Sequence, residues 1–305
     1  MPKLLLLAGI GWCATTPLWL TLFKQKIVNT GISKETEILS YLENPDPEVW
    51  KYRRSAMRNI LYNKNNYMWV RGDADLLFSK DSTLDDFIKY YENLASDDYQ
   101  YVGEFSNANS FLSNNFLTQI APKLKEHFDI RVLMITRDPV RRSYSKTSAD
   151  YRCKTQVNSD ISDDWVNHNP GSRFKWRMLK KQFPTSISYW KHDLLLPKPR
   201  WSNFSYVEIY KKYSEHFPTH AVVMEDLWAG KTEQLENFLE CKLDGLHRNC
   251  YYPEMGTKAP RYEELPDQWM SDLEDLTDED YAFGKKHLQW IYDEWFEEFK
   301  TRPWN

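Results

Sequence analysis

The sequence has little cysteine and little net charge, and each shortage excludes a class of protein. Four cysteines in 305 residues are too few for a disulfide framework, and no Cys/His spacing is typical of a zinc site. A net charge of −4 at pH 7 argues against a general binder of nucleic acid or polyanions, so an anion site must be local. Apolar residues make up 41% of the chain, which is enough for a sizeable core.

The chain also lacks an uninterrupted membrane-spanning run. Residues 4–23 carry no charge and follow Lys3, as in a signal peptide or an anchor. Five residues interrupt this stretch where a spanning helix would be apolar: Gly9, Gly11, Thr15, Thr16 and Pro17. We therefore expect a cytoplasmic protein with no stable membrane insertion.

Two segments outline a nucleotide site. Residues 4–8 predict a buried strand, which leads into a glycine-containing loop and a helix over about 17–28. A loop of this kind at a helix N-terminus wraps a phosphate in backbone N–H groups. Residues 131–136 predict a second buried strand, followed by Arg137 and, eight residues later, by Ser145. Two anion-binding elements suggest a ligand with phosphates at both ends.

The glycine loop, residues 9–16, lacks the lysine of an ordinary P-loop. That motif places Gly-Lys-Ser/Thr four residues after its first glycine, with the lysine on the transferring phosphate and the hydroxyl on magnesium. Here four residues separate Gly9 from Ala14, and Thr15 occupies the lysine position. The loop therefore suits transfer of a less charged group from a donor that needs no metal, and we expect no metal site. Sulfuryl transfer is such a chemistry.

The order of elements predicts an α/β fold. Strand and helix patterns alternate, which predicts a central parallel sheet flanked by helices, with ligands at its carboxyl edge. We expect one domain over 1–305 with a polar insertion or lid at about 151–204, whose basic stretch at 173–181 is either a solvated helix face or part of the lid. The expected strands are 4–8, 67–70, 99–104, 131–136 and 220–224. The expected helices are 17–28, 47–63, 81–94, 115–127, 206–217, 232–239 and an amphipathic 278–299.

Together these segments resemble the sulfotransferases that use 3′-phosphoadenosine 5′-phosphosulfate (PAPS), a family with a P-loop NTPase-like fold. The spacing Arg137-Asp138-Pro139-x-x-Arg142-x-x-Ser145 is most similar to the carbohydrate, or heparan-type, branch. Further stretches follow in the order of that branch, so that the resemblance covers most of the chain: Lys34-Glu35, Gly103-Glu104-Phe105-Ser106, 220–227, 235–239 and 256–261.

The resemblance implies transfer of a sulfuryl group from PAPS, as co-substrate, to a hydroxyl of a saccharide or glycolipid. It implies that Glu35 deprotonates the acceptor. Glu104 is a second candidate base, or a residue that orients a lysine, and Lys34 either biases the charge of Glu35 or contacts the donor. Arg137 and Ser145 are expected on the 3′-phosphate. The other expected nucleotide contacts are Gly11, Trp12, Cys13, Ala14, Thr15, Thr16, Pro17, Gly256, Thr257, Lys258 and Arg261.

Three positions depart from the family. Trp12 stands where Lys or Arg is usual, Ala14 where Gly is usual, and Phe105 where carbohydrate members often carry Lys. Either other cations compensate, or the chain is a degenerate nucleotide binder without transfer. The candidate cations are Lys24, Lys26, Lys34 and Lys258. A P-loop-related nucleotide kinase is a third hypothesis, and the absent loop lysine argues against it.

The resemblance also bears on the cysteines. Related carbohydrate enzymes have a disulfide-closed hairpin near the position of Cys241 and Cys250, so these two are candidates for pairing. In a cytosol they would stay reduced.

Overall fold

The computed structural model describes residues 1–11, 13, 15–31, 34–45, 81–96, 98–155, 181–196, 205–244 and 276–301. The chain divides into two compact units. Unit 1 comprises Met1–Thr136, Tyr206–Glu263 and Arg302–Asn305, and unit 2 comprises Arg137–Ser205 and Glu264–Thr301. The expected single domain with a lid at 151–204 stays a prediction, because 156–180 and 197–204 lie outside the described residues.

Unit 1 is built on a parallel sheet that, within the described residues, has five strands in the order β2-β3-β1-β4-β5. This confirms the expected α/β fold with a central parallel sheet. β1 lies at the centre, and Leu4, Leu5 and Leu7 are fully buried because both faces of the sheet are covered. The strands are β1 (Lys3–Leu7), β2 (Val28–Asn29), β3 (Tyr101–Glu104), β4 (Asp129–Thr136) and β5 (Thr219–Val223).

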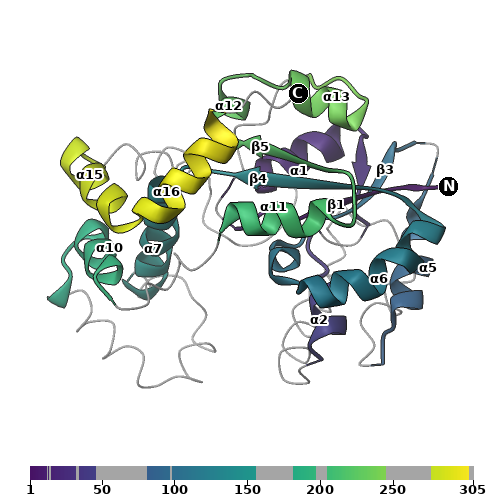
Figure 1. Cartoon of the computed structure of the whole chain (residues 1–305), viewed down its shortest axis with the longest axis horizontal. Coiled ribbons are helices and arrows are strands. Elements are labelled where there is room, and N and C mark those ends of the chain that lie inside the picture. Colours follow the sequence, from purple (N-terminus) through teal and green to yellow (C-terminus); the bar gives the residue numbers. More distant parts are fainter. Residues whose placement is uncertain are drawn as a thin grey trace. The chain divides into compact units, whose positions relative to one another are not determined.

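The helices of unit 1 cover both faces of this sheet. In Figure 1, α1 lies on one face, whereas α5, α6 and α11 lie on the other. The chain crosses the sheet in one direction from β1 to β2, and in the opposite direction from β2 through β3 and β4 to β5. Because such crossovers are right-handed, the first connection places its helix on one face and the later connections place theirs on the other. The reversal makes the carboxyl ends of β1 and β4 the topological switch point, where open α/β sheets bind ligands. The helices are α1 (Thr15–Lys24), α2 (Ile38–Glu43), α5 (Leu84–Leu94), the 3₁₀ helix η1 (Asn107–Phe111), α6 (Asn114–His127), α11 (Tyr206–Ser214), α12 (Met224–Trp228) and α13 (Glu233–Leu239).

Unit 1 contains the strands expected at 4–8, 99–104, 131–136 and 220–224 and the helices expected at 81–94, 115–127, 206–217 and 232–239, whereas α2, η1 and α12 were not expected. A further correction falls near the N-terminus. The expected helix over 17–28 ends at Lys24, because Lys26 adopts a left-handed conformation (φ 56°) and the N–H of Ile27 bonds to the carbonyl of Leu22. The chain then enters the short strand β2, which the sequence did not predict. The expected helix at 47–63 and strand at 67–70 lie outside the described residues. Within the described ranges, no helix combines the length and the apolar character needed to cross a membrane.

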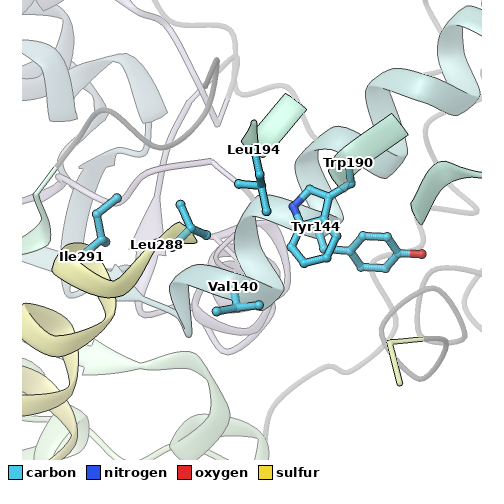
Figure 2. Packing of buried hydrophobic residues seen from close by; sticks show 6 residues of the cluster. All are labelled: Val140, Tyr144, Trp190, Leu194, Leu288 and Ile291. Carbon is cyan, nitrogen blue, oxygen red and sulfur yellow. The ribbon is translucent and has the colours of Figure 1, made fainter. Parts of the chain in front are cut away.

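Unit 2 is helical and has a hydrophobic core of its own. The core consists of Val140 and Tyr144 of α7, Trp190 and Leu194 of α10, and Leu288 and Ile291 (Figure 2). The indole N–H of Trp190 donates to Ser143 Oγ at 3.1 Å, and its ring meets that of Tyr144 edge-on with centroids 5.4 Å apart. A Cβ on Gly284 would lie 2.5 Å from Trp190 Cη2, so glycine is required at this helix contact. The helices of unit 2 are α7 (Pro139–Thr155), α10 (Ser186–Leu194), α15 (Asp278–His287), α16 (Gln289–Trp295) and the π-helical turn η4 (Phe296–Lys300).

The expectation of one continuous helix over 278–299 is wrong. The segment forms α15, α16 and η4, and the first break falls at Leu288 (φ −110°, ψ 19°), which is buried in the core of unit 2. The segment is nevertheless amphipathic as expected, since the apolar residues Ile291, Trp295 and Phe299 are buried and Phe283 is partly buried.

The core of unit 2 predicts that two tryptophans differ strongly in their contribution to the free energy of unfolding. Trp190 is fully buried, whereas Trp290 is 56% exposed. We expect Trp190→Ala to lower the free energy of unfolding by about 3–5 kcal/mol, because it removes a large buried side chain and leaves a cavity. The matched control Trp290→Ala should change it by no more than about 0.5 kcal/mol. Urea unfolding followed by circular dichroism measures both, and equal losses would contradict the assignment of this core.

Candidate functional site

The glycine loop leaves the carboxyl end of β1 and passes closely over β4. The N–H of Ala8 donates to the carbonyl of Leu133 at 2.9 Å. A Cβ on Gly9 would lie 3.3 Å from the backbone N of Ile135, tighter than ordinary van der Waals contact, so a side chain there would press on β4. Cys13 is buried, with its Sγ 3.5 Å from the hydroxyl of Tyr206. The loop delivers the chain to α1, whose N-terminus carries backbone N–H groups and partial positive charge.

Lys34 places a cation at the start of α1. Its Nζ donates to Thr15 Oγ1 and to Thr16 Oγ1, both at 3.1 Å, and to Glu35 Oε1 at 2.7 Å. Its side chain is only 12% exposed. The ammonium group that the glycine loop lacks is therefore supplied by a different segment of the chain.

The carboxylate of Glu35 receives two donors on the same oxygen. Besides Lys34 Nζ, Asn107 Nδ2 donates to Glu35 Oε1 at 3.0 Å. The Glu35 side chain is 31% exposed, so water reaches it. Asn107 was not among the residues predicted from the sequence, although a polar residue just after a strand, at the carboxyl edge of the sheet, was a usable signal.

Glu104, the last residue of β3, is fully buried and surrounded by donors. Its Oε2 accepts hydrogen bonds from Thr36 Oγ1 and Tyr91 OH, both at 3.0 Å, and from the N–H of Thr36 at 3.4 Å. Its Oε1 accepts from Ser106 Oγ and from the N–H of Glu37. Burial raises the pKa of the Glu104 carboxyl to about 7, although these hydrogen bonds favour the ionised form and oppose the rise.

The same contacts fix the segment of residues 34–37 beside β3. The N–H of Glu37 also donates to Ser106 Oγ at 2.8 Å, and the N–H of Phe105 donates to the carbonyl of Lys34 at 3.0 Å. Gly31 turns the chain into this segment with φ 66°, and a Cβ there would lie 2.0 Å from the hydroxyl of Tyr90. The positions of Lys34 and Glu35 therefore depend on β3 and on α5.

Some of the predicted site residues come together in unit 1 and others lie elsewhere. Thr15, Thr16, Lys34 and Glu35 are in direct contact through the Lys34 side chain. Gly11 lies in the loop beside Asn107, and Pro17 is buried in the first turn of α1. Arg137 and Ser145 belong to unit 2, where Arg137 is buried and Ser145 is half-buried on α7. Trp12, Ala14, Gly256, Thr257, Lys258 and Arg261 lie outside the described residues, as does Cys250, and Cys241 has a free thiol.

The chain was compared with models of protein families and with curated proteins. None of them matches it. Its function is therefore inferred from the contacts of Lys34 with the glycine loop and with Glu35.

The buried carboxyl of Glu104 predicts a specific pH dependence of stability. Its pKa rises from 4.5 to about 7 on folding, so the protonated form is favoured in the folded state. This contribution to stability is fully present below pH 4.5 and is lost as the pH rises through 7. The pKa difference corresponds to roughly 3 kcal/mol.

We therefore expect the free energy of unfolding of the wild type to fall between pH 4.5 and 8 relative to that of Glu104→Gln. Urea titrations at several pH values measure this difference. Glu126→Gln, at an exposed position on α6, is the control and should leave the pH dependence unchanged. Parallel pH profiles for the wild type and Glu104→Gln would contradict the prediction.

Proposed function

We propose that this chain is a PAPS-dependent sulfotransferase with a P-loop NTPase-like fold, which transfers a sulfuryl group to a hydroxyl of a saccharide or glycolipid. The observation that supports it best is the contact of Lys34 with Thr15 and Thr16 at the start of α1. An ammonium group, two hydroxyls and a helix N-terminus together suit a phosphate. The resemblance in sequence assigns that phosphate to PAPS.

Each residue then has a defined part in the transfer. The acceptor oxygen attacks sulfur while the bond from sulfur to the leaving phosphate oxygen breaks. Glu35 takes the proton of the acceptor hydroxyl. Lys34 and the N-terminus of α1 balance the negative charge that develops on the leaving phosphate. No metal has a part in this scheme.

Glu35 is a better candidate for the base than Glu104. A general base must come within hydrogen-bond reach of the proton that it removes. Glu35 is 31% exposed, whereas Glu104 is fully buried and accepts hydrogen bonds from Thr36, Tyr91 and Ser106. We therefore assign proton transfer to Glu35 and a supporting role to Glu104. The roles of Arg137 and Ser145 on the 3′-phosphate, and of Lys258 and Arg261 over the nucleotide, stay predictions from the sequence.

A degenerate nucleotide binder is the second candidate. Phe105 is fully buried, so its position supplies no cation where carbohydrate sulfotransferases often carry lysine. Specific binding of 3′-phosphoadenosine 5′-phosphate without transfer to any acceptor would favour this alternative. Magnesium-dependent turnover of ATP without sulfate transfer would favour a nucleotide kinase.

Nucleotide binding tests the proposal directly. In calorimetric titrations we expect the wild type to bind 3′-phosphoadenosine 5′-phosphate more tightly than AMP or ATP. Lys34→Ala should weaken binding of the bisphosphate about 10- to 100-fold, because a charged hydrogen bond contributes about 1.5–3 kcal/mol.

The control for this titration is Lys24→Ala, which removes an exposed lysine at the opposite end of the same helix. It should leave the affinity unchanged. Equal affinities of the wild type for the bisphosphate, AMP and ATP would argue against PAPS as the donor. Equal losses in the two lysine variants would remove Lys34 from the site.

The assignment of Glu35 as the base predicts that its replacement lowers the rate of transfer without weakening nucleotide binding. Glu35→Gln keeps the size of the side chain and removes the proton acceptor, so the affinity for 3′-phosphoadenosine 5′-phosphate should stay near that of the wild type. The rate of sulfate transfer should fall about 10²- to 10⁴-fold, with the loss in kcat. Radiolabelled PAPS with a panel of saccharide acceptors measures the rate. Transfer at the wild-type rate would show that Glu35 is not the base, and Glu104→Gln tests the alternative.

A further inference from the structure

Asn107 lies between the two parts of the proposed site. Its Nδ2 donates to Glu35 Oε1 at 3.0 Å. The same Nδ2 would lie 3.7 Å from a Cβ on Gly11, so the amide is next to the glycine loop. Asn107 is thus a described side chain that adjoins both the loop and the carboxylate.

The backbone around Asn107 is held firmly against β1. Asn109 Nδ2 donates to the carbonyl of Leu7 at 3.2 Å, and Ser110 Oγ donates to the carbonyl of Ala8 at 2.9 Å. On the other side, Tyr213 OH of α11 donates to the carbonyl of Asn109 at 2.6 Å. These bonds tie η1 to the end of the central strand, from which the glycine loop departs. The side chain of Asn107 therefore projects from a rigid support.

The carboxylate of Glu35 determines which atom of the Asn107 amide faces it. An ionised carboxylate only accepts hydrogen bonds, so the NH₂ group and not the oxygen must face Glu35. The amide oxygen Oδ1 is then buried and has no hydrogen-bond partner among the described residues. A buried acceptor without a partner costs about 1–3 kcal/mol.

We infer that Asn107 is a positioning residue that holds the Glu35 carboxylate beside the glycine loop. It shares Glu35 Oε1 with Lys34, which contacts the start of α1. The two donors fix the carboxylate from two sides, one from the segment after β2 and one from η1. The catalytic part of this inference rests on the proposed function, because it takes Glu35 as the base.

The first test needs neither nucleotide nor acceptor. In ¹⁵N-labelled protein, the side-chain NH₂ signals of Asn107 are those missing from the spectrum of Asn107→Ala. We expect the chemical shifts of these signals to change in Glu35→Gln, because the charged acceptor of the Asn107 hydrogen bond is replaced by a neutral amide. Signals that do not respond to Glu35→Gln would overturn the inference, whether or not the chain transfers sulfate.

The second test measures transfer from radiolabelled PAPS to the saccharide panel. Asn107→Ala should lower kcat about 10- to 100-fold, the effect of losing a hydrogen bond to a charged group, and should leave the affinity for 3′-phosphoadenosine 5′-phosphate nearly unchanged. Asn107→Asp places a second carboxylate beside Glu35, so the acid limb of its pH–rate profile should move to higher pH. A purely structural asparagine would not move that profile.

The matched control is Asn114→Ala. Asn114 Nδ2 also donates to a glutamate carboxylate, Glu215 Oε2 at 3.0 Å, but on the exposed surface of the same unit. It should leave kcat and the pH–rate profile unchanged. Wild-type kcat in Asn107→Ala would overturn the inference. If the wild type binds no bisphosphate and transfers no sulfate, the proposed function fails, and the NMR response still decides whether Asn107 holds Glu35.

Discussion

The geometry of the site depends on the buried carboxylate of Glu104. It ends β3 in the interior, where a carboxylate without partners would be very costly. Its donors come from the segment of residues 34–37, from Ser106 and from Tyr91 of α5. If that segment moved away, the carboxylate would lose the hydrogen bonds that favour its charged form. The hydrogen bonds to the buried Glu104 carboxyl therefore hold Lys34 and Glu35 in place.

The cation at the start of α1 consequently depends on tertiary structure. In an ordinary P-loop the lysine belongs to the loop itself, so the loop sequence is enough to place it. Here Lys34 reaches Thr15 and Thr16 from the segment that follows β2. That segment requires the turn at Gly31 and the hydrogen bond from Phe105 to the carbonyl of Lys34. A change in β2, α5 or β3 would thus move this cation without touching the loop.

The strands and helices of unit 1 were predicted from the sequence better than the side-chain contacts of the site. Short apolar runs at β1 and β4 favour buried parallel strands, because they are too short for typical helices and parallel strands are covered on both faces. The start of α1 followed from the glycine loop. The contacts of Lys34 with Thr15 and Thr16, and of Asn107 with Glu35, could not be read from spacing. They join residues that are 18 to 72 positions apart in the chain. The break at Leu288 was missed for a related reason, since it follows from packing in the core of unit 2 and not from the helical pattern.

Under the proposed function, Phe105 stands where carbohydrate sulfotransferases often carry lysine, and Lys34 supplies the cation instead. Its ring is fully buried, and a Cβ on Gly103 would lie 3.0 Å from Phe105 Cε2. A lysine in that place would bury an ammonium group in an apolar environment, which is costly without a paired charge. The backbone N–H of Phe105 instead supports the carbonyl of Lys34. Phe105 therefore fills the interior after β3 with its ring and, through its backbone, helps to hold Lys34 at the start of α1.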